Sequence, residues 1–136
     1  YFAITADIYN ILSFGIDYDC ETPDGAGKSK GESMARVARL LCADLNELDK
    51  KNIIEICEYI HNKQVGDIGK ALQMVAGKEL PRIYVAGVGR EVGNKVCKAF
   101  EFDFVDLSTI TRGYDNLPCL GLAYMCSGEN LITDKS

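Results

Sequence analysis

The segment from residue 82 to residue 107 constrains the fold of this 136-residue chain more than any other. A strand-like run at 83–86 is followed by the glycine turn at Gly87 and Gly89, an apolar helical pattern, and a second strand-like run at 102–107. Elements in this order form a βαβ unit, which is right-handed and pairs its strands in parallel. The sequence therefore predicts an α/β fold.

Helical periodicity accounts for most of the remaining chain. Apolar residues recur every three or four positions over 2–14, 29–43, 49–77 and 116–128. The second segment opens with the capping box Ser29-x-x-Glu32, and the third predicts one long helix, or two in line with a break near Gly66. We expect one compact, helix-rich unit over 1–136, with a loosely held tail over 129–136.

The same periodicity predicts which side chains are buried. The inner face of the second helix is formed by Met34, Val37, Ala38 and Leu41, and its edges by Arg36 and Arg39. Four cysteines lie on apolar helix faces and are predicted to be small core residues: Cys42, Cys57, Cys97 and Cys126.

Charge and cysteine spacing exclude several protein classes. The net charge is -5 and the fifteen Lys and Arg residues form no basic stripe, which argues against a nucleic-acid partner. Apolar runs fall short of the roughly 18 to 20 residues of a membrane span, and no secretory leader pattern occurs, so we expect a cytoplasmic protein without membrane contact. Six cysteines without a C-x-x-C pair indicate reduced thiols.

The chain begins at Tyr1, already inside a helical pattern. We therefore expect a piece of a longer protein, whose N-terminal remainder shares the function.

The polar, glycine-rich run CETPDGAGKS at 20–29 is the clearest candidate site. Flexible glycines, Lys28 and the backbone amides at a helix start are typical of an anion site. The run is not a Walker A loop, because that motif requires a glycine where Thr22 stands and a buried strand before it. The equally weighted alternative is plain turn-and-cap structure, in which Ser29 caps the helix.

Three polar residues interrupt apolar helical faces. Asp7 lies either on the solvated side of its helix, which is the preferred interpretation, or toward a cleft. His61, the only histidine, is predicted at the surface or at the edge of the core, and not as a catalytic base. Gln64 is predicted to make a buried hydrogen bond or to face a cleft.

The Gly87-x-Gly89 turn partly matches the dinucleotide-binding fingerprint. Asp106 stands near the offset of about 20 residues expected of a ribose-binding acid. Val92 occupies the position of the third glycine and Gly93 comes one residue late, so the match is weak.

Together these motifs resemble a known family. The segments ADIYNIL at 6–12, CETPDGAGKS at 20–29, the helix around Gln64 and VAGVG at 85–89 resemble archaeal proteins linked to the tetrahydromethanopterin one-carbon pathway. These proteins are relatives of hydantoinase and oxoprolinase in the ASKHA superfamily, whose fold is RNase H-like and actin-like. The resemblance covers the C-terminal part of the family's chain.

The resemblance implies a transferase of methanofuran biosynthesis. Such an alkyl-aryl transferase condenses an aminomethylfuran-methyl diphosphate with γ-glutamyltyramine, forms an ether and releases diphosphate. The reaction implies a divalent metal, most simply Mg²⁺, and small-molecule substrates. ATP is not expected, because Arg90 and Glu91 follow the glycines where small residues are typical of nucleotide binders, although ATP is not excluded.

The implied roles of individual residues follow from that reaction. Asp24 would hold a metal-bound water or act as the base, with Asp7 as a supporting carboxylate. The residues expected to bind substrate phosphates are Thr22, Gly25, Gly27, Lys28, Ser29, Gly87, Gly89 and Arg90.

The alternative from another class is a nucleotide-binding module. It would be an ATP-binding kinase or hydrolase half of the ASKHA type, or a dinucleotide-binding module, with Gly87, Gly89 and Asp106 around the ribose. A purely scaffolding role and a homodimer are further possibilities.

Overall fold

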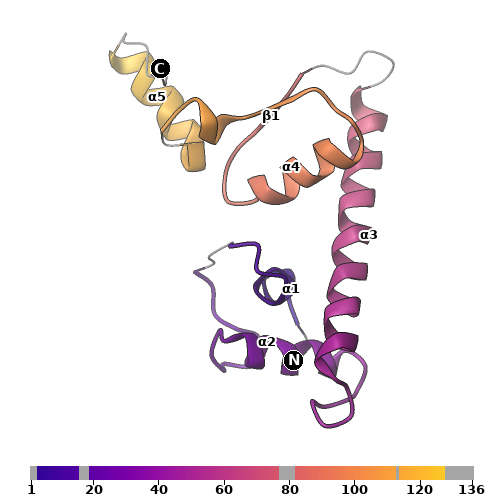
Figure 1. The fold of residues 1–136 in the computed structure, drawn as a ribbon. Coiled ribbons are helices and arrows are strands. Elements are labelled where there is room, and N and C mark those ends of the chain that lie inside the picture. Colours follow the sequence, from indigo (N-terminus) through magenta and orange to yellow (C-terminus); the bar gives the residue numbers. More distant parts are fainter. Residues whose placement is uncertain (1–2, 16–18, 77–81, 113, 128–136) are drawn as a thin grey trace. The chain divides into compact units, whose positions relative to one another are not determined.

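The computed structural model of the chain describes residues 3–15, 19–76, 82–112 and 114–127 (Figure 1). These residues are rich in helix and include a small parallel sheet, which is compatible with the predicted α/β class. They divide into two compact units, Tyr1–Gln64 and Val65–Ser136. The single compact unit and the ASKHA fold stay predictions, and the tail at 129–136 lies outside the described residues.

The first unit contains α1 (Thr5–Ile11), α2 (Lys30–Arg39) and the N-terminal part of α3 (Lys50–Ala76) (Figure 1). Helix α1 is shorter than the predicted 2–14. It begins at Thr5 because the Asp7 carboxylate accepts the amide of Ile4 at 3.1 Å, and it ends before Ser13, whose φ of 59° is left-handed.

The core of the first unit joins all three helices. Its buried members are Ile8, Ile11, Met34, Val37, Ile53 and Cys57. The predicted inner face of α2 is confirmed for Met34, Val37 and Ala38, but it is wrong for Leu41, which is 57% exposed. The reason is that α2 ends at Arg39 and the chain turns at Cys42, whose φ is 55°; Cys42 is therefore exposed, against prediction.

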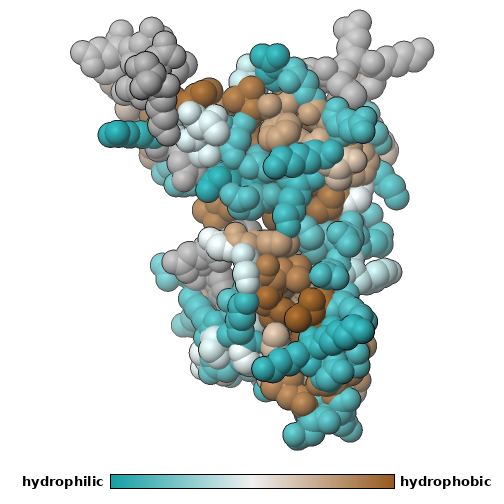
Figure 2. Space-filling model, viewed as in Figure 1, coloured by the Kyte–Doolittle hydropathy of each residue, from teal (hydrophilic) through white to brown (hydrophobic). Residues whose placement is uncertain are grey.

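Helix α3 runs without interruption through Gly66, so the alternative of one long helix is confirmed. Its 27 residues correspond to a length of about 40 Å. Several large apolar side chains along it, among them Tyr59, Met74 and Val75, are exposed. Figure 2 shows hydrophilic side chains over most of the face drawn, with hydrophobic patches in both units.

The second unit confirms the predicted βαβ order. Strands β1 (Ile83–Val85) and β2 (Phe104–Asp106) pair in parallel, and α4 (Arg90–Ala99) connects them (Figure 1). The core consists of Val65, Val85, Val96, Cys97 and Phe102. A Cβ at Gly93 would lie 2.7 Å from Cγ1 of Val85, so this glycine lets α4 approach β1 closely.

The segment after β2 forms η1 (Leu107–Thr109), η2 (Tyr114–Asn116) and α5 (Leu117–Ser127). The predicted start of the last helix is confirmed, since the Cys119 amide donates to the Asn116 side chain at 3.3 Å. Cys126 is exposed, so its predicted core position is wrong: the face of α5 that carries it is not covered by the described residues. In the part of the chain that the structure describes, no helix is both long and apolar enough to cross a membrane.

Candidate functional site

The run 20–29 forms a closed turn beside a pocket. Gly25 has a φ of 69°, and its amide donates to the Thr22 carbonyl at 3.1 Å, while the Thr22 hydroxyl donates to the Ala26 carbonyl. The turn is one wall of a pocket of about 530 Å³. The pocket is lined by Asp19, Cys20, Glu21, Thr22, Gly25, Ala26, Gly27 and Lys28.

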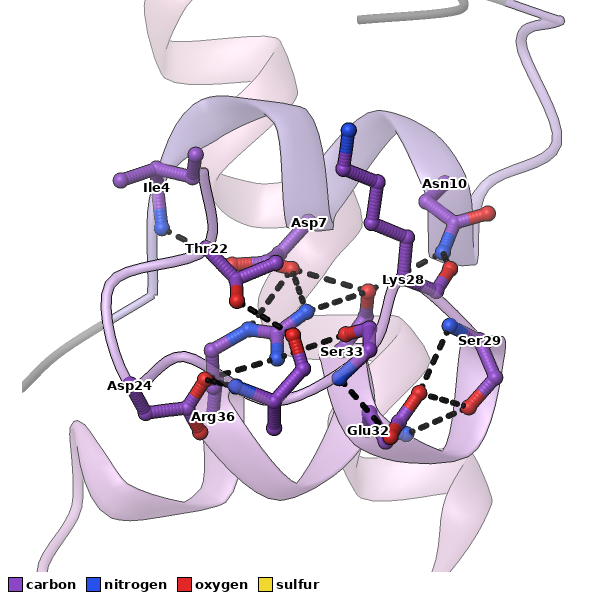
Figure 3. Close-up of polar contacts among 12 residues, drawn as sticks. Ile4, Asp7, Asn10, Thr22, Asp24, Lys28, Ser29, Glu32, Ser33 and Arg36 are labelled. Carbon is purple, nitrogen blue, oxygen red and sulfur yellow. Dashed lines mark hydrogen bonds and ion pairs between the residues drawn. The ribbon is translucent and has the colours of Figure 1, made fainter. Parts of the chain in front are cut away.

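Two of the amides predicted to hold an anion already bind a carboxylate of the chain. One oxygen of the Glu32 carboxylate accepts the Gly27 amide at 2.9 Å, and the other accepts the Ser29 amide at 2.9 Å and the Ser29 hydroxyl at 2.6 Å (Figure 3). These hydrogen bonds, led by that from the Ser29 hydroxyl, lower the pKa of Glu32. Ser29 is the N-cap of α2, as the capping-box alternative predicted.

A buried ion pair lies beneath the turn. Asp7 and Arg36 both have 0% side-chain exposure, and Nη2 of Arg36 lies 2.7 Å from Oδ1 of Asp7. The preferred interpretation of Asp7 as a solvated side chain is therefore wrong, and so is the placement of Arg36 at the edge of α2. Helical periodicity put both residues off the apolar stripe, but each faces the other between α1 and α2.

Asp24 is held by two guanidinium groups. Its Oδ1 lies 3.1 Å from Nη1 of Arg36 and its Oδ2 lies 2.7 Å from Nη1 of Arg39. The hydrogen bond from Arg39, with smaller contributions from the Ala26 amide and Arg36, lowers the pKa of Asp24 from 3.8 to about 2 against the effect of burial. A carboxylate with so low a pKa is a weak general base near neutral pH.

Lys28 is anchored through its backbone. The Asn10 side-chain amide donates to the Lys28 carbonyl at 2.8 Å and to the Ser33 hydroxyl at 3.0 Å, and Ser33 in turn donates to Asp7 at 2.8 Å. In Figure 3 the Lys28 side chain extends away from the Arg36 guanidinium. The network thus fixes the backbone of Lys28, a residue that lines the pocket.

A smaller pocket of about 290 Å³ is lined by Tyr9, Asn10, Ser13, Gly15 and Lys30. The Tyr9 hydroxyl donates to the Gln64 side chain, which confirms the predicted hydrogen bond of Gln64. Burial raises the pKa of Tyr9 and this hydrogen bond opposes the rise.

His61 packs inside the first unit. Its ring lies 4.7 Å from the ring of Phe14 and 6.0 Å from that of Tyr9, and the residue is 6% exposed. The predicted surface position is therefore wrong, because two aromatic rings cover the imidazole, and of the two predicted positions the core edge is the one that fits.

The glycine turn of the second unit lies at the carboxyl end of β1. Gly87 has a φ of 80°, and Gly89 is the N-cap of α4. Arg90 makes ion pairs with Glu91 at 2.9 Å and with Asp106 at 3.5 Å, and Asp106 also accepts from Asn94 at 2.6 Å. Burial raises the pKa of Asp106, but these partners and Ser108 outweigh burial and lower it overall.

Asp106 therefore already uses its oxygens within the unit, which does not favour the ribose-binding role of the alternative reading. Gly87, Gly89 and Arg90 belong to the second unit and the 20–29 turn to the first. A joint phosphate site formed by both stays a prediction.

Two curated proteins are similar to this chain in sequence. Both are named (4-{4-[2-(gamma-L-glutamylamino)ethyl]phenoxymethyl}furan-2-yl)methanamine synthase. The protein from Methanocaldococcus jannaschii is 37% identical over 95 residues, which cover 68% of this chain and 29% of that relative. The protein from Methanococcus vannielii is 32% identical over 114 residues, which cover 79% of this chain and 51% of that relative.

The matched chain thus spans about half, or less, of the length of these relatives. No protein-family model matches it.

The floor of the site, which lies beneath the turn at 20–29, is formed by Asp7, Asn10 and Arg36. The sequence patterns do not predict Asn10 and Arg36 there. Arg36 was assigned to a helix edge, and Asn10 was given no role. A signal for Arg36 was present, since an acidic residue on an otherwise apolar helix needs a buried cation when it faces inward. The sequence analysis also assigns no role to Asp19 and Glu21, which flank Cys20 and belong to the lining of the pocket.

The part of the chain that the structure describes offers no preformed metal centre. Among residues 3–15, 19–76, 82–112 and 114–127, no three His, Cys, Asp or Glu side chains gather into a potential metal site. Mg²⁺ needs only one or two carboxylates when substrate phosphates and water supply its other ligands. Asp19 and Glu21 could supply them, whereas Asp24 is engaged by Arg36 and Arg39.

Proposed function

We propose that the protein is a synthase of the aryl alkyl ether after which its two relatives are named, and that it acts in methanofuran biosynthesis. The observation that carries the proposal is 37% and 32% identity to these synthases over 68% and 79% of the chain. The activity is proposed for the whole protein, because the matches cover only 29% and 51% of the relatives.

The product name defines the bond that is made. It contains a phenoxymethyl group on a furan ring, so the phenol oxygen becomes bonded to the methylene carbon attached to the furan. In the proposed reaction this carbon carries a diphosphate, whose C–O bond breaks and whose oxygen takes the electron pair. The phenol gives up its proton to a base, and the products are the ether and free diphosphate.

The pocket at 20–29 is the proposed place for the diphosphate. Lys28 supplies a positive charge, and Asp19 and Glu21 are proposed to hold Mg²⁺, which would stabilise the charge that develops on the leaving group. The amides of Gly27 and Ser29, expected from the sequence to contribute, bind Glu32 instead and are left out of the proposed contacts. Thr22, Gly25 and Gly27 shape the wall.

The test combines binding and turnover in the full-length protein. Calorimetry with diphosphate and Mg²⁺ should show binding that Lys28→Ala weakens by about tenfold or more, the expected loss of a charge-assisted contact. Mass spectrometry should detect the ether after incubation with the furfuryl diphosphate and the phenol. The control is Lys70→Ala, which removes an exposed lysine of α3 in the second unit.

Micromolar binding of ATP or NAD without ether formation would overturn the proposal in favour of a nucleotide-binding module. Diphosphate binding that Lys28→Ala leaves unchanged would remove the turn from the site.

A further inference from the structure

We propose that Arg36 is a positioning residue that fixes where Lys28 enters the pocket. The inference deepens the proposed function and rests on it for the identity of the ligand, but its structural part stands independently. No role for Arg36 follows from the relatives' names, and the sequence places it at a helix edge. What carries the inference is the set of partners that this one side chain joins.

The Arg36 guanidinium connects two helices with the pocket wall. On the inner side, Nε and Nη2 donate to Oδ1 of Asp7 at 3.0 and 2.7 Å. On the outer side, Nη1 donates to Oδ1 of Asp24 at 3.1 Å and to the Gly27 carbonyl at 3.1 Å. Each of its three nitrogens therefore has an acceptor, and two of these acceptors belong to the 20–29 turn (Figure 3).

The neighbouring backbone carbonyls of Gly27 and Lys28 each accept a hydrogen bond from a side chain that is connected to Asp7. Arg36 donates to the carbonyl of Gly27, and Asn10 donates to the carbonyl of Lys28 at 2.8 Å. Asn10 reaches Asp7 through Ser33, by bonds of 3.0 and 2.8 Å. The backbone on both sides of the Lys28 peptide is thus held by two donors, Arg36 and Asn10, each of which is connected to the Asp7 carboxylate by hydrogen bonds.

Complete burial makes this arrangement rigid and specific to arginine. Arg36 and Asp7 have 0% side-chain exposure, so neither can exchange its partner for bulk water without opening the unit. A planar guanidinium presents donors in fixed directions, whereas a lysine ammonium is a single point charge on a flexible stem. Lysine could keep the charge opposite Asp7, but it could not also reach both Asp24 and the Gly27 carbonyl.

A buried ion pair is seldom the most stable solution for a core, because apolar residues of similar volume are often as good or better. In this proposal the role of the pair is the geometry that it imposes on the turn. Small displacements of a positioned charged group reduce catalysis steeply, by as much as about 100-fold for 1 Å. Arg36 therefore acts on the reaction through Lys28, without touching the substrate.

The experiment compares Arg36→Lys with wild type in the full-length protein. Hydrogen exchange of peptides covering 20–29 should quicken by about tenfold or more, because the turn loses two of its anchors. The KM for the diphosphate substrate should rise by a similar factor, while the KM for the phenol stays within about twofold. Arg82→Ala, which breaks an exposed ion pair with Asp103 in the second unit, should change neither quantity.

Unchanged exchange of 20–29 together with an unchanged KM in Arg36→Lys would refute the proposal. If that variant fails to fold, the neutral pair Asp7→Asn with Arg36→Met is measured in the same way and with the same criteria. If wild type neither binds diphosphate nor makes the ether, the proposed function fails, and the exchange result alone decides whether Arg36 holds the turn.

Discussion

Removing the charge of Arg36 without removing that of Asp7 should destabilise the first unit severely. In Arg36→Met the apolar stem is largely retained, so packing changes little, but Asp7 keeps its charge with 0% exposure and loses its cation. The Gly27 carbonyl also loses a donor. Asp24 loses one of its two guanidinium partners as well, but it is partly exposed and keeps Arg39, so the uncompensated buried carboxylate of Asp7 is the largest part of the cost.

Breaking a buried ion pair on one side costs about 3–5 kcal/mol, which is a large share of the stability of a small domain. The hydrogen bonds from Ser33 and from the Ile4 amide remain on Asp7, which places the expected loss at the lower end of that range. Adding Asp7→Asn should recover part of the loss, because the asparagine needs no cation, but its one oxygen can accept from Ser33 or from the Ile4 amide and not from both. The coupling between the two substitutions should be about 2 kcal/mol or more.

Two buried cysteines allow each unit to be followed separately. Cys57 lies in the core of the first unit with 0% exposure, and Cys97 lies in that of the second with 1% exposure. Burial, with the nearby charges of Asp7 and Glu58, raises the pKa of Cys57 to about 11, so this thiol reacts slowly while it is folded. Pulsed alkylation across a urea series, read by mass spectrometry, gives a midpoint for each cysteine.

The midpoint for Cys57 should fall in Arg36→Met and rise again in part in the double variant, while the midpoint for Cys97 stays fixed as the internal control. A double variant no more stable than the sum of its single changes would contradict the reasoning. So would an Arg36→Met protein in which Cys57 is as protected as in wild type.

Three further outcomes are expected. The pKa of Asp24 is about 2 in the folded protein and 3.8 ordinarily, so the ionised Asp24 adds to the free energy of unfolding fully above pH 3.8, and this contribution is lost as the pH falls through about 2. Arg39→Ala should raise the pKa of Asp24, measured by NMR titration of the carboxyl group. An unchanged pKa would contradict the assignment. Gly69→Ala should destabilise the second unit by about 1–3 kcal/mol, because the new Cβ would lie 2.1 Å from the ring of Phe100. Gly66→Ala, in the same helix, has no atom within 4 Å of the new Cβ and should stabilise the second unit by up to about 1 kcal/mol. Both changes are measured by the Cys97 midpoint. Ser29→Ala should cost about 1 kcal/mol by the Cys57 midpoint, and no loss would argue against the cap.

The elements of the fold were largely predictable because local signals define them. The Ser29-x-x-Glu32 box marks the start of α2, and the βαβ order follows from strand, glycine turn and helix without any long-range information. The ends of elements were less predictable. The short α1 depends on the left-handed Ser13, and the exposure of Leu41 depends on the turn at Cys42, neither of which leaves a mark on hydrophobic periodicity.

The floor of the candidate site was not predictable for a physical reason. Periodicity distinguishes apolar from polar faces, and it has no way to show that two polar residues 29 positions apart, Asp7 and Arg36, satisfy each other inside the protein. The turn itself could be found from its glycines and Lys28. The bond from the Ser29 amide to Glu32 followed from the capping box, but the bond from the Gly27 amide to the same carboxylate did not, because it depends on how the turn folds back over the helix start.

The Glu32 carboxylate competes with external anions for the backbone amides of the turn at 20–29. An anion that approached the Gly27 and Ser29 amides would have to displace a group held on the same chain, at the high effective concentration of an intramolecular ligand. Weak monovalent anions such as acetate or chloride gain little over a carboxylate already in place. Common anions therefore do not displace Glu32 from the two amides. Only a ligand that makes further contacts elsewhere in the pocket gains enough binding energy to do so.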